Sequence, residues 1–160
     1  PTPSFSTVTP LPSWTGVTTL NGTATAILAE GNVNIKRPVD PIFTVQGVQR
    51  PYQLFAGAVS VDGALTLVME SDTELQYFLS NTRPALDIDF TQGSGSSAQQ
   101  VKLHLSKCAF TVAKIERGKE YIELAVTYKG LANTTDAGAS SGYSPIKVTL
   151  QNAKASGTYA

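Results

Sequence analysis

Cysteine and histidine are almost absent from this chain of 160 residues, which has one of each, Cys108 and His104. A single cysteine excludes an internal disulfide and a cysteine cage for a metal ion. Charged residues are also sparse at 15%, and 12 basic residues balance 12 acidic ones, so the chain lacks the basic excess typical of nucleic-acid binding. No apolar run reaches the 18 residues that a membrane-spanning helix needs, so we predict no membrane span.

The few reactive side chains do not form a recognisable catalytic or metal-binding pattern. His104 falls on the polar side of an alternating segment, and Cys108, four residues on, would lie ~13 Å away along a strand. We therefore expect His104 to be a surface residue and Cys108 a buried structural one. Asp87 and Asp89 share one strand face at ~6.6 Å, a spacing that a solvated face explains better than paired catalysis. We predict no enzyme activity, no cofactor and no metal site.

Strand-forming patterns fill most of the chain. Serine and threonine are abundant, and apolar residues alternate with polar ones in about nine or ten segments separated by polar turns. This predicts an all-β fold with one flanking helix, an antiparallel β-sandwich or partly closed barrel in a single domain over residues 17–160. Residues 1–16 are rich in Pro, Thr and Ser and predict an extended arm, either a disordered terminus or a segment that orders against a neighbour through Phe5 and Trp14.

One helix is expected near residues 72–81. Ser71 to Glu74 has the form of a capping box, with Ser71 as the cap and Glu74 reaching back. Leu75, Phe78 and Leu79 then fall on one narrow stripe at helical spacing, which predicts that they pack the helix on a sheet.

A tight hairpin turn is expected at Asp62-Gly63, in the stretch from Gln53 to Asn81. The dipeptide lies between two apolar runs and suits a type I′ turn, which requires positive φ at both central residues. That turn would pair Val61 with Ala64 and Ala58 with Leu67. Both faces of such a hairpin are largely apolar, so something must cover each of them.

Residues 34–50 combine three features that do not suit a central strand. The wider segment to Tyr52 holds three prolines, an apolar run at Ile42 to Val45, and several charges. It predicts either an edge strand between loops or a long protruding hairpin that docks on another molecule. For the second alternative the expected interface residues are Lys36, Arg37, Asp40, Ile42, Phe43, Val45, Val48 and Arg50.

The amount of apolar surface favours self-association. A two-faced apolar hairpin, a proline-rich arm and an apolar protrusion are more than a lone domain needs, and ring closure would cover open strand edges. The alternative is a carbohydrate-binding β-sandwich module. Its sugar platform would have to come from Trp14, Tyr52, Tyr77 and Tyr143, whose spacing follows no pattern.

Three segments resemble the major tail tube proteins of long-tailed bacteriophages: Ile35 to Gly47, Ala56 to Asn81, and Ser144 to Asn152. The resemblance covers roughly residues 17–152. It implies a structural subunit that forms hexameric rings, stacked into a hollow tube through which the genome passes without sequence-specific contacts. It also implies that residues 34–50 contact the next ring and that the helix lies on the outer flank. The implied partners are copies of the chain and other tail proteins at the tube ends, in a virion tail assembled in the bacterial host cytoplasm.

Overall fold

Two β-sheets carry most of the structure, a computed structural model that describes residues 10–45, 47–95, 98–118, 120–136 and 142–152. A five-stranded sheet has the order β11-β8-β7-β1-β2, and a four-stranded sheet has the order β3-β6-β10-β9. The strands of the first are β1 (Gly16–Leu20), β2 (Thr23–Thr25), β7 (Leu86–Gln92), β8 (Gln99–Leu105) and β11 (Lys147–Gln151). Those of the second are β3 (Leu28–Lys36), β6 (Ser60–Val68), β9 (Cys108–Glu116) and β10 (Glu123–Gly130).

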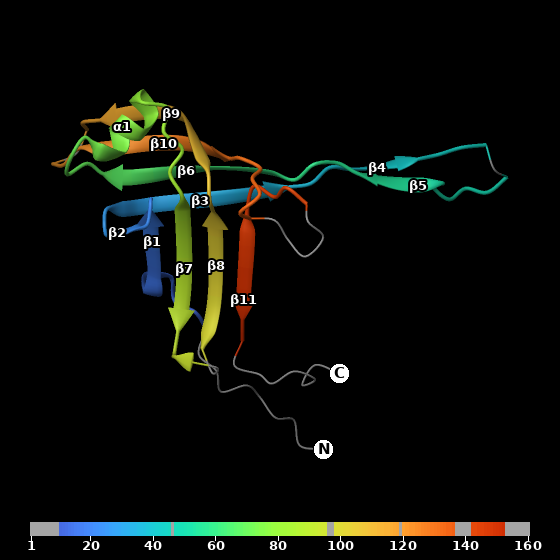
Figure 1. Ribbon diagram of the computed structural model, residues 1–160, viewed down its shortest axis with the longest axis horizontal. Coiled ribbons are helices and arrows are strands. Elements are labelled where there is room, and N and C mark those ends of the chain that lie inside the picture. The colour runs from blue at the N-terminus through green and yellow to red at the C-terminus, as the bar shows by residue number, and fades with distance from the viewer. Residues whose placement is uncertain (1–9, 46, 96–97, 119, 137–141, 153–160) are drawn as a thin grey trace, which may run out of the picture.

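The strands of the two sheets run across one another in Figure 1, and neither sheet closes into a barrel. The core lies between them, because apolar residues alternate inward on the central strands of both, among them Leu65, Leu86, Leu105, Leu124 and Val126. The predicted all-β sandwich with one flanking helix is confirmed. A third, two-stranded sheet of β4 (Val39–Ile42) and β5 (Gln53–Ala56) brings the described strands to eleven, more than expected.

The predicted hairpin turn at Asp62-Gly63 is wrong. Both residues lie inside β6, which pairs with β3 on one side and with β10 on the other. Gly63 faces Tyr128: a Cβ there would lie 2.2 Å from the Asn32 carbonyl oxygen and 2.6 Å from the Tyr128 Oη. Glycine is therefore required for close packing, and the Val61–Ala64 and Ala58–Leu67 pairs do not form.

The partner of Gln53–Ala56 is β4, not the segment after Gly63. Val39 pairs with Ala56 and Ile42 with Gln53. Pro38 and Pro51 flank this short ladder and Pro41 lies within β4, and a residue without a backbone N–H limits pairing with further strands.

The helix α1 (Thr73–Leu79) exists where expected but is shorter and capped differently. Asp72, not Ser71, is its N-cap and makes no side-chain cap bond, although the Thr73 amide donates to Ser71 Oγ at 3.3 Å. Leu75 and Phe78 pack against the core as predicted. Leu79 does not, since it is 62% exposed.

Tyr77 also packs α1 against the sheet, which the helical stripe did not predict. Its ring meets that of Phe110 edge-on, with centroids 6.3 Å apart, and Phe110 belongs to β9. This aromatic pair fixes α1 over the β9 side of the four-stranded sheet (Figure 1).

Of the predicted N-terminal arm, residues 1–9, including Phe5, lie outside the described residues. The short 3-10 helix η1 (Ser13–Thr15) leads directly into β1 at Gly16, and Trp14 is exposed. Within the described part of the chain, no helix has the length and apolarity needed to cross a membrane.

Candidate assembly surfaces

The β4–β5 ladder and the residues that connect its strands form a projection, which we call the arm (residues 38–57). It is distinct from the extended N-terminal segment predicted for residues 1–16. Figure 1 shows it extending well beyond both sheets as a continuation of β3 and β6. Among the residues predicted as an interface, Ile42, Phe43, Val45 and Val48 all lie here with exposed side chains. The structure thus has the protruding hairpin predicted from residues 34–50, and its second strand is β5, which lies beyond that range.

The arm has one purely apolar face. Directly paired residues of an antiparallel ladder point to the same side, so Val39, Ala56, Pro41 and Leu54 share a face. The opposite face is mixed, with Asp40 paired to Phe55 and Ile42 to Gln53. Val39, Leu54 and Phe55 are more than half exposed, so the isolated chain leaves the arm's apolar surface in water.

Two of the predicted interface charges fasten the arm to the body. Lys36 Nζ lies 3.5 Å from Asp62 Oδ1. Arg37 Nε donates to the Gly57 carbonyl oxygen at 3.1 Å, and the Gly57 amide donates to the Pro38 carbonyl oxygen at 2.9 Å. These contacts tie the two ends of the arm together. Asp62, predicted as a turn residue, acts instead as the acidic partner of Lys36.

Open strand edges flank the four-stranded sheet. Its outer strands, β3 and β9, are nine residues long each, and no strand in the described part of the chain pairs with their outer sides. Long unpaired edges are templates for pairing with another chain.

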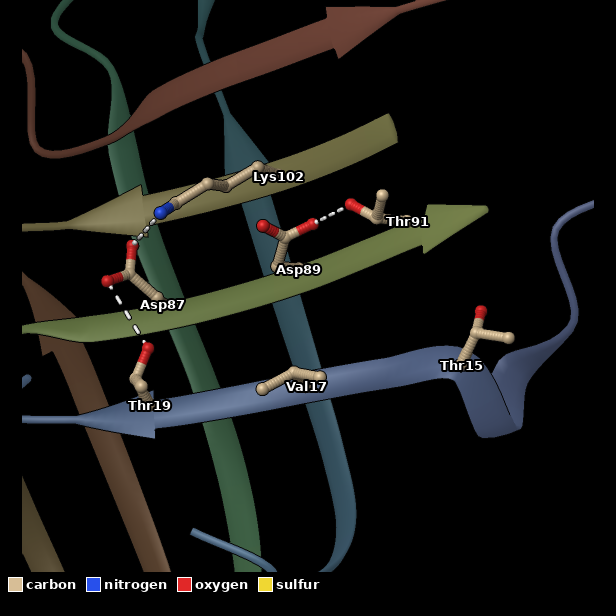
Figure 2. A pocket seen from close by; sticks show the side chains of 7 residues that line it. All are labelled: Thr15, Val17, Thr19, Asp87, Asp89, Thr91 and Lys102. Atoms are coloured by element: carbon tan, nitrogen blue, oxygen red, sulfur yellow. Dashed lines mark hydrogen bonds and ion pairs between the residues drawn. The ribbon is translucent and has the colours of Figure 1, made fainter. Parts of the chain in front are cut away.

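The outward face of the five-stranded sheet is polar. Its central part forms an open depression of about 370 Å³, lined by Thr15, Val17, Thr19, Asp87, Asp89, Thr91 and Lys102. Figure 2 shows Asp87 between Lys102 and Thr19, and Asp89 bonded to Thr91. Asp89 also accepts two bonds from Gln100. The two carboxylates are held by neighbours, as the predicted solvated face requires, and within the described residues no cluster of three or more His, Cys, Asp or Glu is placed to hold a metal ion.

His104 has partners that the sequence did not indicate. Its Nδ1 contacts Asp87 Oδ1, and its Nε2 lies 3.0 Å from Ser106 Oγ. This order of carboxylate, imidazole and hydroxyl resembles a hydrolytic triad. Ser106, however, donates its one hydroxyl hydrogen to Asp136 Oδ1 at 2.6 Å, so His104 has no serine proton to accept. The arrangement connects elements and does not activate a nucleophile.

Asp136 anchors the loop between β10 and β11. It is 1% exposed and accepts bonds from the Ser106 amide, the Ser106 hydroxyl and Asn133 Nδ2. Burial raises the pKa of Asp136, but these hydrogen bonds outweigh burial and hold the pKa below its usual value. Burial, together with the nearby Asp136 charge, raises the pKa of the Cys108 thiol to about 12, in keeping with the expected structural cysteine.

The aromatic residues of the alternative sugar platform come from separate elements. Trp14 lies in η1, Tyr52 in the arm directly before β5, and Tyr77 in α1 against Phe110. Tyr143 precedes β11. Because the Tyr77 ring is engaged inside the fold, it is not an open stacking surface.

Comparison with known proteins identifies the family of this chain. The family model described as phage tail tube protein matches residues 1–156. Among solved structures, the anti-feeding prophage cap, described as a tube terminating cap, has the same fold with a TM-score of 0.60 at 9% identity, over 92% of this chain and 96% of that one. A search of curated proteins found no match. Since the family model spans nearly the whole sequence, this chain belongs to the phage tail tube protein family and is a structural component of a phage tail.

Proposed function

We propose that the chain is the repeating subunit of a tail tube and assembles into rings of six copies, as the family resemblance implies, that stack around a channel for the genome. The observation that carries this is the arm, a two-stranded projection with an apolar face that its own chain leaves uncovered. A protruding apolar surface of this kind is costly in water and is stabilised when another molecule covers it. Its partner in the tube is a subunit of the adjacent ring.

Ring closure uses the edges of the four-stranded sheet. The outer strands β3 and β9 have equal lengths and lie on opposite sides of the sheet. Pairing of β3 from one copy with β9 of the next is a head-to-tail contact, which closes into a ring when the rotation per subunit divides a full turn. The arm continues β3 and β6, so strands that run along the tube wall would direct it toward the next ring (Figure 1).

The same proposal makes the chain a non-enzymatic structural protein. Other tail proteins would cap the tube ends, DNA would pass through the channel without specific contacts, and assembly would take place in the host cytoplasm. The group of Asp87, His104 and Ser106 supports this proposal, because the Ser106 hydroxyl donates to Asp136 and not to His104.

Negative-stain electron microscopy of the purified chain tests the proposal. We expect rings at moderate concentration and tubes with a central channel at high concentration. A variant without residues 39–56, joined by a short turn between Pro38 and Gly57, should stay folded, because the Gly57–Pro38 bond closes the base of the arm. It should form no tubes. A chain that stays monomeric at every concentration and binds glycans would instead support the carbohydrate-binding module.

A further inference from the structure

The five-stranded sheet carries a second apolar surface, which the described residues cover only in part, on the face that elsewhere forms the core. Phe90 pairs with Val101, and Val101 pairs with Leu150, so the three lie in one row on the inner face. Val148 belongs to the next row. We call these four residues the shelf.

The four-stranded sheet covers only part of the shelf, since Phe90 packs against the core while Val148 and Leu150 are exposed. In Figure 1, β7, β8 and β11 extend beyond the four-stranded sheet. Leu86 and Leu105, at the covered ends of their strands, are fully buried, whereas Leu150 is 73% exposed and Val148 45% exposed. Near Leu11, Phe90 and Val101 line an open depression of about 320 Å³ with mostly apolar walls.

We propose that the shelf is the surface on which the arm of a second copy docks, through its face of Val39, Pro41, Leu54 and Ala56. The inference rests on the proposed tube function and assigns the receiving site. Among the described residues, the apolar face of the arm and the Val148–Leu150 side of the shelf are both exposed, and contact between them would remove apolar surface of both from water.

The dimensions of the two surfaces agree. The arm ladder is four residues long, about 13 Å, and two strands wide. The shelf row crosses three strands, about 10 Å from β7 to β11, and Val148 and Leu150 lie about 6.6 Å apart along β11. The apolar face of the arm likewise has two residues on each of two strands, so the two surfaces match in size.

The arm that fills the shelf comes from another copy. Each arm is fastened at its base by the Arg37–Gly57 and Gly57–Pro38 bonds, and it points away from its own shelf (Figure 1). Donor and acceptor surfaces differ, so the contact is head-to-tail and leaves a free arm at one end and a free shelf at the other. This is the property that stacking of successive rings requires.

Disulfide trapping between two populations tests the assignment. Both carry Cys108→Ala, one also Leu54→Cys and the other Leu150→Cys; positions 54 and 150 are exposed, so folding should be unaffected. After mixing, assembly and mild oxidation, we expect dimers linked through positions 54 and 150, identified by mass spectrometry. The matched control replaces Leu150→Cys with Thr149→Cys, the neighbouring residue that points to the opposite face of β11, and should give at least tenfold fewer dimers.

Each other result contradicts the inference. Tubes that form normally without the 54–150 cross-link, or that link position 149 equally well, overturn the shelf assignment and leave the tube function intact. Efficient cross-linking of Val8→Cys to Leu150→Cys within one chain would show that residues 1–9 cover the shelf instead. If the unmodified chain forms neither rings nor tubes, the proposed function fails, and this inference with it.

A charge pair gives a second test. Leu150→Lys should prevent stacking, because the arm's apolar face cannot cover an ammonium group without a partner. Adding Leu54→Glu should restore tubes at least partly, while Leu54→Glu alone should prevent them. Failure of the double variant to form tubes, when both singles fold, contradicts the contact between the two positions.

Discussion

Replacement of Gly63 by alanine tests the central packing of the four-stranded sheet. The new Cβ would lie 2.2 Å from the Asn32 carbonyl oxygen, 2.6 Å from the Tyr128 Oη and 2.7 Å from the Tyr128 Cζ. The first is backbone, and the others belong to a ring that is fully buried, so neither can move freely. Tyr128 and Asn32 must separate from Gly63, which strains the hydrogen bond of 2.9 Å between the Tyr128 hydroxyl and the Asn32 carbonyl oxygen.

The expected cost follows from two effects. Overpacking a filled site costs about 1–3 kcal/mol. A buried hydroxyl left without its partner costs about 1–3 kcal/mol more. Alanine in place of glycine in a strand returns about 0.5–1 kcal/mol. We therefore expect Gly63→Ala to lower the free energy of unfolding by about 1–5 kcal/mol.

Urea unfolding of the monomer, followed by circular dichroism, measures this loss. Gly118→Ala is the matched control, because nothing lies within 4 Å of a Cβ at that position, and it should change stability by less than about 0.5 kcal/mol. Gly63→Asn separates the strand from a turn: asparagine tolerates the positive φ of a turn but should be worse than alanine inside β6. Equal stability of Gly63→Ala and Gly118→Ala would refute the close approach of Gly63 to Tyr128.

Three further outcomes follow from the packing and the buried groups. Phe78→Ala should lower the free energy of unfolding by about 2–4 kcal/mol, since the ring is partly buried against the core, while Leu79→Ala should cost less than about 0.5 kcal/mol; equal losses in urea unfolding would contradict the described face of α1. Because the pKa of Asp136 is lowered in the folded state, its carboxylate stabilises the fold above an unfolded pKa of about 4, and this contribution is lost as pH falls through the folded pKa. Stability measured between pH 7 and pH 3 should therefore fall less steeply in Asp136→Asn, and an unchanged slope would count against the anchor. Cys108, with its pKa raised to about 12, should resist iodoacetamide at pH 8 until the chain is unfolded, and rapid labelling of the native protein would show that the thiol is open to solvent.

Periodicity was sufficient to predict the fold class and the helix. The strands from residue 85 onward alternate cleanly because one face is buried and the other is in water, and Leu75 and Phe78 follow helical spacing for the same reason. The stripe included Leu79 and omitted Tyr77 because spacing alone does not say which neighbour, here Phe110, the helix will meet.

The Asp62-Gly63 error shows where local signals fail. An Asp-Gly dipeptide allows a turn. Position 63 requires glycine for another reason, since Tyr128, 65 positions later in the sequence, packs directly against it. The residues around Asp62-Gly63 are apolar on both faces because β6 is a central strand between β3 and β10. Tertiary contacts across the chain decided the conformation, and no local pattern contained them.

Only part of the candidate assembly surfaces could be predicted from the sequence. The protruding arm was predictable, because its prolines and apolar residues do not suit a buried strand. The sequence did not predict three other features: the roles of Lys36 and Arg37 at the base of the arm, the His104–Ser106–Asp136 network, and the shelf. Each depends on contacts between elements far apart in the sequence.

Amide hydrogen exchange on the free subunit and on the assembled tube tests whether another copy covers the arm. We expect the amides of residues 39–56 to exchange rapidly in the free subunit and to become strongly protected in the tube, while those of β6 are protected in both. Equal protection of the arm in the free subunit and in the tube would contradict this expectation.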